Sequence, residues 1–457
     1  AEVVGHTTGP VITMFELSLA PGVKVNRISN LDNDIARSLA APGVRIAAIG
    51  IGRLGEDVNP IETTVATLSG RAGSEGISLL ESDALTVGDA TATISRVAAD
   101  AGLSDVTDAT QSDLVTADGS GGSIVLRVTD GDLTLEDGSA PGDDRAVSAD
   151  GTGNIRLEAI DTDHSVTANA DVESDGGDVS ILAGHSIEFA GEADVDTGNE
   201  GTIDFEASGG SITLSTTSNQ RTGSGDIRLL AGDNLSLGGL AQTSGSFSAT
   251  AESGWIRDAD SDGSVDVEAD GLCLDAAVGI GRLGDDVNPI ETTVATLSGQ
   301  AGTEGISVLE SDALTVGETT VTVGRVGSDA GVSDLTDAAQ SDLITQDGSD
   351  GSIVLRTADG SITLEDGTAP DDEGAIFADG SGNVLVEAAG SAADVVANAD
   401  VVSETGNVTI LAATDVNFGN GANVSRLGAG SIDLEATTGA IDLGVTNDQN
   451  AGSGDIR

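Results

Sequence analysis

The feature that most constrains this chain is a seven-residue phrase, Gly-x-Ile-x-Leu-x-Ala, that recurs at nearly constant spacing. From one occurrence of the phrase to the next, its first apolar residue moves along the chain by 31 residues once and then by 24 residues three times. These steps occur twice, at Ile124, Ile155, Val179, Ile203 and Ile227, and again at Ile353, Val384, Val408, Ile432 and Ile456. A fixed period of this length is typical of solenoids, in which each repeat buries its apolar face by stacking on its neighbours.

A longer duplication contains both runs of the phrase. Each residue of the second run lies 229 positions after its counterpart, as Ile353 does after Ile124, and the copies align without a gap from Gly50 to Arg228 of the first copy. We therefore predict one continuous solenoid in three parts. These parts are a cap or partial repeat at 1–48, a first block at 49–277 and a truncated second block at 278–457. Because the chain starts at Ala1 and stops within a phrase, we expect a piece of a longer protein.

The 24-residue unit at 201–224 indicates how one coil is built. Ile203, Phe205 and Ala207 alternate with polar residues, which is the pattern of a strand with one buried face. A Gly-Gly pair interrupts that strand, and a second short alternation follows at 212–214. Two or three short strands per coil, with Gly, Asp, Asn and Ser at the corners, predict an all-β fold, a right-handed parallel β-helix. The alternative, an antiparallel sandwich of hairpins, would not repeat a 24-residue step.

Stacking the coils in register places similar residues in columns. The second inward column contains Leu126, Leu157, Ile181, Phe205 and Leu229, and the third contains Val128 and then only alanines. A glycine two places before the first column, such as Gly201, is expected at a corner that needs positive φ. Outward residues can pair between coils, so we expect Asp204 beside Arg228 and Asp433 beside Arg457.

Two kinds of segment depart from the period. Residues 89–121 and their copy at 318–350 stretch one interval beyond a coil, and we expect them to protrude as a loop or a short hairpin. Residues 1–42 have no partner 229 positions later. Within them, residues 30–42 have the pattern of a short helix closed by proline, which would cap the open end of the solenoid.

The charge of the chain limits the partners that we expect. There are 77 acidic and 18 basic residues, which gives a formal net charge of −59. Since phosphate binding needs a basic surface, we predict no nucleic-acid partner, and no apolar run is long enough to span a bilayer. Strict apolar–polar alternation argues against the disorder that such a charge can signal. Cys273 is the only cysteine, so we expect a buried thiol and no disulfide.

Candidate catalytic groups are sparse. Neither His164 nor His185 has a histidine at its second-copy position, so we expect isolated surface imidazoles. Parallel β-helices also include polysaccharide-cleaving enzymes, and Asp143-Asp144 and Asp371-Asp372 are candidates for paired carboxylates. A polyuronate substrate would require basic residues, whereas this chain has a single lysine and a large negative charge. We predict that the chain is not an enzyme, with an extracellular polysaccharide-cleaving lyase or hydrolase as the alternative.

The segment from Asp258 to Asp266 is the one candidate metal site. Oxygen ligands stand at its positions 1, 3 and 5, a glycine at position 6 and an apolar residue at position 8, as in the first half of a calcium loop. The predicted ligands are Asp258, Asp260, Asp262 and Asp266. Position 12 is Ala269 rather than glutamate, so a plain acidic turn remains the alternative. Calcium is the only cofactor that we predict.

Several phrases resemble the repeats of a known family. The segments at 153–159, 225–239 and 406–416 resemble the repeats of filamentous-haemagglutinin-like adhesins and related haemagglutinin-repeat proteins of bacterial surfaces. The phrase at 57–68, repeated at 286–297, is similar to phrases in long repeat arrays of aquatic bacteria.

This resemblance implies a structural and adhesive rod segment of a giant secreted or cell-surface protein. The partners that it implies are glycans or proteins of cell surfaces and matrices, together with a continuation of the same solenoid. The location that it implies is extracellular, at an outer-membrane-associated cell surface.

Overall fold

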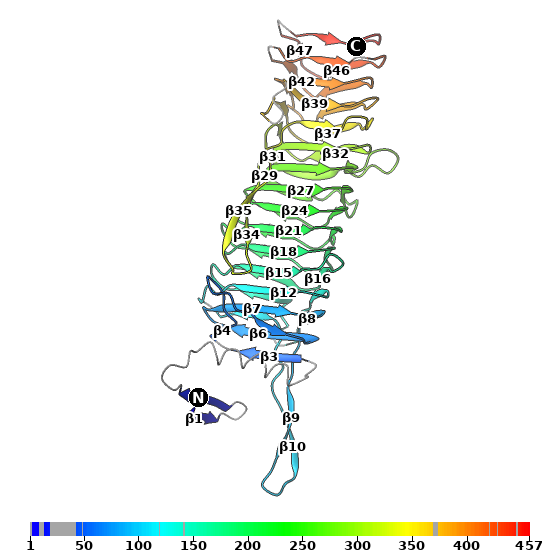
Figure 1. The fold of residues 1–457 in the computed structure, drawn as a ribbon. Coiled ribbons are helices and arrows are strands. Elements are labelled where there is room, and N and C mark those ends of the chain that lie inside the picture. The colour runs from blue at the N-terminus through cyan, green and yellow to red at the C-terminus, as the bar shows by residue number, and fades with distance from the viewer. Residues whose placement is uncertain are drawn as a thin grey trace.

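A computed structural model describes residues 2–8, 13–18, 43–47 and 49–457, except 118, 140–141, 369–372, 420, 427 and 445–446. The described residues form strands and connecting turns, without a helix, and 42 of the strands belong to one ladder-connected sheet. Figure 1 shows the result, a long rod of stacked coils. The predicted all-β parallel solenoid is confirmed. Among the described residues there is no helix of the length and apolarity needed to cross a membrane.

Each coil contributes a strand to each of three faces. In one coil these are β21 (Ile203–Ala207), β22 (Ile212–Leu214) and β23 (Gln220–Thr222). Every ladder between coils is parallel, and Ile203 pairs with Ile227 and Asp204 with Arg228, as predicted. The 24-residue step therefore sets the register, because each coil places its apolar residues directly against those of the next.

The strands of the three faces follow one another along the rod. The first face contains β7 (Gly76–Glu81), β12 (Ile124–Val128), β15 (Ile155–Ala159), β18 (Val179–Ala183), β21, β24 (Ile227–Ala231), β27 (Ser246–Ala251), β36 (Leu343–Thr345), β39 (Gly374–Ala378), β42 (Asp400–Ser403), β45 (Val424–Arg426) and β48 (Gln449–Asn450). The second contains β8 (Leu85–Val87), β13 (Leu133–Leu135), β16 (Val166–Ala168), β19 (Ile187–Phe189), β22, β25 (Leu235–Leu237), β28 (Trp255–Asp258), β30 (Gly279–Ile280), β32 (Gly305–Glu310), β37 (Ile353–Thr357), β40 (Val384–Ala388), β43 (Val408–Ala412) and β46 (Ile432–Ala436). The third contains β6 (Thr67–Ala72), β11 (Leu114–Thr116), β14 (Arg145–Ala149), β17 (Asp171–Ser174), β20 (Val195–Thr197), β23, β26 (Ala241–Gln242), β33 (Leu314–Val316), β38 (Ile362–Leu364), β41 (Val395–Ala397), β44 (Val416–Phe418) and β47 (Ile441–Asp442). The long strands β29 (Val267–Ala276) and β31 (Ile290–Ala301) cross from the third face to the first.

The two blocks are offset by one face where they meet. The phrase column of the first block continues from Ile227 through Phe247 and Leu272. The phrase of the second block does not continue this column, because Ile353 pairs with Ile306 on the second face. The duplication therefore repeats the coils but turns them, which the linear spacing did not predict.

The core of the rod is a stack of aliphatic side chains with a few aromatic ones. Phe205 is fully buried, and its ring stacks on that of Phe189 with 5.3 Å between centroids and 4° between planes. The alanines of the third column, such as Ala207, are also buried. Burial of the inward columns stabilises the rod at about 25 cal/mol per Å² of apolar surface.

The glycines before each phrase strand form a ladder of close backbone contacts. The prediction of positive φ at these corners is wrong, since Gly153, Gly177, Gly201 and Gly225 are absent from the residues with positive φ. A Cβ atom at Gly201 would instead lie only 2.3 Å from the Gly177 carbonyl oxygen on the preceding coil. These positions need glycine because the chain passes too close to its neighbour for any side chain.

Both predicted protrusions are antiparallel hairpins, but they lie in different places. The first hairpin pairs β9 (Thr93–Val97) with β10 (Leu103–Thr107), and the second pairs β34 (Thr322–Val326) with β35 (Val332–Thr336). Figure 1 shows the first hairpin projecting beyond the N-terminal end of the rod and the second lying along its side, over β18, β21 and β24.

Three strands precede the first block proper. β1 (Glu2–Thr8) and β2 (Thr13–Ser18) pair antiparallel, and β3 (Gly43–Ala47) adds a parallel strand to β6. The short strands β4 (Gly50–Ile51) and β5 (Ile61–Thr63) pair with β7. The helix predicted at 30–42 lies outside the described residues, and the division at 48 and 277 stays a prediction.

Candidate cation site

Three carboxylates converge where the first block meets the second. Asp258 ends β28, Asp266 directly precedes β29, and Glu291 is the second residue of β31. Oxygen atoms of all three lie within 4.8 Å of one another. Asp266 and Glu291 become neighbours because β29 and β31 pair in register from Val267 and Thr292 onwards. The segment between β28 and β29 folds back so that Asp258 faces both.

These carboxylates are buried and only partly satisfied. Asp258, Asp266 and Glu291 are 8%, 6% and 7% exposed. Asp258 Oδ1 accepts a hydrogen bond from the Asp260 backbone N–H at 2.8 Å, and Asp266 Oδ2 accepts one from the Glu291 N–H at 3.0 Å. Asp258 Oδ2 and Glu291 Oε2 are buried and have no hydrogen-bond partner among the described residues. Buried polar atoms without partners are costly, so this cluster is a place where a bound cation would lower the free energy.

The pKa values of all three groups are raised. Burial raises the pKa of Asp266 to about 9, and the negative charges of Asp258 and Glu291 add to the effect. Burial also raises the pKa of Glu291 to about 7, again with a contribution from Asp258. Burial likewise raises the pKa of Asp258. The cluster therefore holds protons at neutral pH unless another positive charge replaces them.

The structure brings together half of the predicted calcium ligands. Asp258 and Asp266 belong to the cluster, whereas Asp260 and Asp262 do not. Asp262 is exposed, and hydrogen bonds from Ser264 lower its pKa, as in an ordinary acidic turn. Sequence reasoning missed Glu291, since it searched one loop and not the next coil. Counting one coil, 25 residues, from Asp266 would have found it.

This arrangement belongs to the junction and not to the repeated design. The first-copy positions of Asp258 and Asp266 are Ser29 and Arg37, so the carboxylates are absent there. The first-copy counterpart of Glu291 is Glu62, which is exposed.

A surface hollow of about 510 Å³ adjoins the cluster. The described residues that line it include Asp260, Ser264, Asp266 and Glu268, and none of them is a lysine or an arginine. Carboxylate and carbonyl oxygens with access to water are the ligands that Ca²⁺ takes, in sets of six to eight. Such a lining attracts a cation and repels an anionic substrate.

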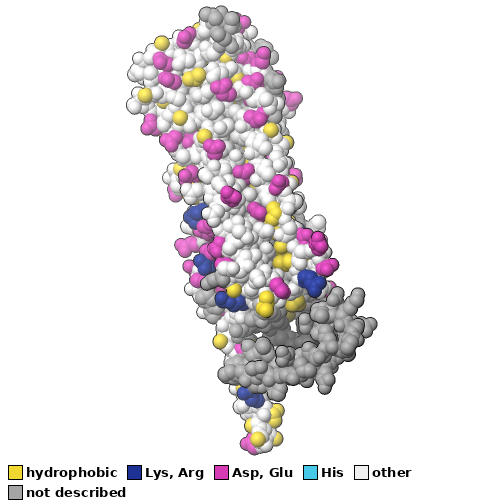
Figure 2. All heavy atoms as spheres, turned by 90° about the vertical axis from the view of Figure 1, so that its left-hand side faces the viewer, with side chains coloured by type: hydrophobic (Ala, Val, Ile, Leu, Met, Phe, Trp, Pro, Cys, Tyr) yellow, Lys and Arg dark blue, Asp and Glu magenta, His cyan; other side chains and the backbone are white. Residues whose placement is uncertain are grey.

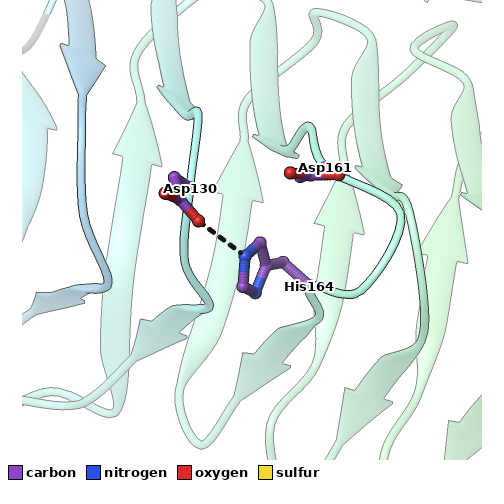
Figure 3. A group of neighbouring side chains, drawn as sticks. All are labelled: Asp130, Asp161 and His164. Atoms are coloured by element: carbon purple, nitrogen blue, oxygen red, sulfur yellow. Dashed lines mark hydrogen bonds and ion pairs between the residues drawn. The ribbon is translucent and has the colours of Figure 1, made fainter.

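A second cluster lies on the surface of the first block. Figure 3 shows His164 directed toward Asp130, with Asp161 nearby, and His164 Nε2 is 3.2 Å from Asp130 Oδ1. His164 is thus not the isolated imidazole expected from the sequence. Both carboxylates are exposed to solvent, and neither is among the buried polar atoms without a partner in the described residues.

The remaining candidate residues from the sequence do not form a catalytic group among the described residues. Asp143 Oδ2 lies 3.6 Å from Arg145 Nη1 in a partly exposed ion pair, and Asp371 and Asp372 lie outside the described residues. Cys273 is buried as expected, and burial raises the pKa of its thiol to about 11. That the chain is not an enzyme stays a prediction.

Comparison with known proteins finds sequence similarity at the N-terminus of the chain. The FtsK alpha domain family matches residues 1–57. The DNA translocase FtsK of Vibrio vulnificus is 62% identical over 53 residues, which cover 12% of this chain and 5% of that protein. The FtsK of Shewanella oneidensis is 58% identical over 53 residues, 12% of this chain and 6% of that protein, and the FtsK of Caldanaerobacter subterraneus is 50% identical over 68 residues, 13% and 10%. The chain thus spans at most a tenth of these relatives. No solved structure matches it.

These matches contradict the adhesin interpretation. The resemblance to haemagglutinin repeats, the adhesive or polysaccharide-cleaving function, the glycan partners and the extracellular location are all overturned by the match to DNA translocases. The physical reason is that Gly-x-Ile-x-Leu-x-Ala describes a coil of a β-solenoid, so it specifies the fold and not the family.

The prediction of no nucleic-acid partner is also contradicted, and charge averaging explains the error. Residues 1–57 contain five Lys or Arg and six Asp or Glu, a net charge of −1, which leaves −58 of the −59 for the remainder. Figure 2 shows acidic side chains distributed along one face of the rod, with the few basic ones in its lower half. The total charge therefore describes the solenoid and not the matched segment.

Proposed function

We propose that this chain works together with a DNA translocase, through the segment 1–57 that matches the FtsK alpha domain. The observation that carries the proposal is the 62% identity over 53 residues to the Vibrio vulnificus DNA translocase FtsK. The almost neutral charge of the segment supports the proposal, because a segment with so little net negative charge does not strongly repel DNA or a DNA-bound protein. The solenoid would then be a stiff acidic extension held to the segment through β3, which pairs with β6.

The test uses the full chain and the Vibrio vulnificus translocase. We expect the two to form a complex in sedimentation velocity, and we expect the complex to be lost when residues 1–42 are removed. Circular dichroism of the shortened chain checks that the rod is still folded. Equal binding by both forms, or no binding by the full chain, would contradict the proposal. Binding of duplex DNA alone, measured by fluorescence anisotropy, shows whether DNA or the protein is the partner.

A second function is carried by the three buried carboxylates. We propose that Asp258, Asp266 and Glu291 bind a divalent cation, calcium in preference to magnesium, and so join the two blocks. Unpartnered buried oxygens on Asp258 and Glu291 support this assignment. Calcium fits better because it accepts irregular sets of oxygen ligands, whereas magnesium requires nearly ideal octahedral geometry and loses its water reluctantly.

Thermal unfolding at matched ionic strength separates binding from screening. A ligand that binds only the folded state raises the melting temperature as its concentration increases. We expect calcium to raise it more than magnesium in the wild type and in Asp262→Asn, the matched control with an exposed carboxylate. We expect the calcium-specific increment to disappear in Asp266→Asn and in Glu291→Gln. Identical curves for the two ions in the wild type would show that they only screen the charge.

A further inference from the structure

One imidazole of the first block stands among three carboxylates. His164 Nε2 lies 3.2 Å from Asp130 Oδ1, and His164 Nδ1 lies 3.6 Å from Asp132 Oδ1. A carboxylate oxygen of Asp161 lies within 4.8 Å of ligand atoms of both His164 and Asp130 (Figure 3). In the described part of the chain, no lysine or arginine forms an ion pair with any of these aspartates. The negative charges therefore converge on a histidine and not on a permanent cation.

Three successive coils supply the groups around this position. Asp130 lies in the turn before β13, and Asp161 and His164 lie in the turn before β16. The turn before β19 adds His185, whose backbone N–H donates to the His164 carbonyl oxygen at 2.9 Å. Because β16 and β19 pair in register, the two histidines hold the same place on adjacent coils, about 4.8 Å apart. Two of the three histidines of the chain are thus direct neighbours.

The His185 side chain can turn toward its neighbour. It is exposed, and its Nδ1 atom lies 2.9 Å from Ser186 Oγ. Its Nε2 atom makes no hydrogen bond or ion pair with the described residues. Exposed side chains change rotamer within nanoseconds, so a small cost in free energy brings this second nitrogen toward His164.

The donor set fits a transition-metal ion better than calcium or magnesium. Imidazole nitrogen is a preferred ligand of zinc, nickel and copper, whereas calcium and magnesium take oxygen ligands. Zinc is usually held by four ligands at about 2.0–2.2 Å in a tetrahedron, whose corners are then about 3.3–3.6 Å apart. The 3.2 Å between His164 Nε2 and Asp130 Oδ1 is close to this separation.

We propose that Asp130, Asp161, His164 and His185 bind one divalent transition-metal ion, zinc or an ion of the same coordination chemistry. Two carboxylates balance the charge of the ion, and two imidazoles supply its nitrogen ligands. Asp132 faces the other ring nitrogen of His164 and orients the imidazole, as carboxylates commonly do for zinc-bound histidine. The ion joins three successive coils at the corner between the first and second faces.

The second block provides an internal comparison. The second-copy counterparts of the four proposed ligands are Asp359, Gly390, Ala393 and Thr414. Of these only Asp359, which is exposed, carries a carboxylate or an imidazole. The junction cluster of three carboxylates differs in another way, because it contains no nitrogen ligand. The two clusters therefore differ in the class of metal that they prefer.

Isothermal titration calorimetry of the full chain with zinc tests the proposal, with calcium in excess to occupy sites made of carboxylates alone. We expect one zinc ion per chain. His164→Ala, His185→Gln and Asp130→Asn should each bind zinc at least about tenfold more weakly, since even the loss of a group that orients a ligand costs about this much. Asp359→Asn and Asp266→Asn should bind as the wild type does. Circular dichroism without zinc checks that each variant is folded.

Nuclear magnetic resonance of the chain labelled with nitrogen-15 histidine shows which imidazoles bind. The chain has three histidines, so His164→Ala and His185→Gln assign the ring signals of two of them. We expect one equivalent of zinc to shift the ring nitrogen signals of both residues. Zinc that leaves either pair of signals unchanged would overturn the proposed ligand set. Equal zinc affinity in the wild type and in Asp130→Asn would overturn it as well, since exposed imidazoles alone would then be the ligands.

Discussion

Arg325 and Asp204 are 121 residues apart in the chain, yet Arg325 Nε lies 2.7 Å from Asp204 Oδ2. Asp204 is fully buried and also accepts from Arg228 Nη1 at 3.0 Å on the next coil. Two guanidinium groups thus surround one carboxylate. Because a buried charge without a partner is strongly destabilising, the second hairpin is part of what allows Asp204 to be buried.

Replacing Arg325 should release the hairpin from the rod. In Arg325→Ala, Asp204 keeps only Arg228, and we expect a loss of about 2 kcal/mol, the usual size of a hydrogen bond to a charged group. Amide hydrogen exchange should become faster across β34 and leave β21 nearly unchanged. Arg96→Ala removes the equivalent arginine of the first hairpin, which makes no ion pair among the described residues, and should not change the stability. Unchanged protection of β34 in Arg325→Ala would show that apolar contacts alone hold the hairpin.

The glycine ladder should tolerate no side chain. In Gly201→Ala the new Cβ would overlap the Gly177 carbonyl, and relief requires the backbones of two coils to separate. We expect a loss of about 1–3 kcal/mol, the usual range for overpacking. Gly317→Ala is the matched control, since its nearest new contact is 3.6 Å and its φ is not positive. Equal chemical denaturation curves for the two variants would contradict this explanation.

The stacked phenylalanines should be the largest single contributors to the core of the first block. Phe205→Ala leaves a cavity beside Phe189 and should cost about 3–5 kcal/mol. Phe205→Asp should cost more, because it also buries a charge. Phe377→Ala, at a half-buried outward position in β39, should cost much less. Denaturant unfolding monitored by circular dichroism measures all three.

The sequence was sufficient for the fold wherever the period was regular. Period-two alternation and the 24-residue step predicted both the parallel pairing and the neighbours Asp204 and Arg228, since a slip in register would expose the inward columns. Local spacing could not predict the one-face offset at the junction, because long strands such as β29 turn the chain there. It also missed Arg426, a fully buried side chain that donates to the carbonyl oxygens of Gly406, Gly430 and Ala451.

The candidate site was predictable only in part. The spacing of Asp258 and Asp266 pointed to the correct place, but a loop motif cannot show a ligand on the next coil, and Glu291 enters through the pairing of β29 with β31. The family was misjudged for a related reason. The repeated phrase dominates the chain and indicates the solenoid, whereas the informative segment, 1–57, lies outside the duplication except for residues 50–57.

The cation site should make stability depend on pH in a defined direction. The pKa of Asp266 is raised from 3.8 to about 9 and that of Glu291 from 4.5 to about 7, so the folded state holds these protons more tightly than the unfolded state. Their contribution to the free energy of unfolding is complete below about pH 4 and is lost as the pH rises through 7 and then 9. In a chelator, we expect the wild type to lose stability from about pH 5 to pH 9, and calcium should reduce that loss because it binds the deprotonated carboxylates. Asp113 and Asp171, whose pKa values burial raises to about 7 and about 6, add a slope of the same sign, so the measured quantity is the difference between the wild type and Asp266→Asn. That difference should grow between about pH 4 and pH 9 without calcium, and an identical pH slope in the two proteins would show that the pKa of Asp266 is not raised in the folded state.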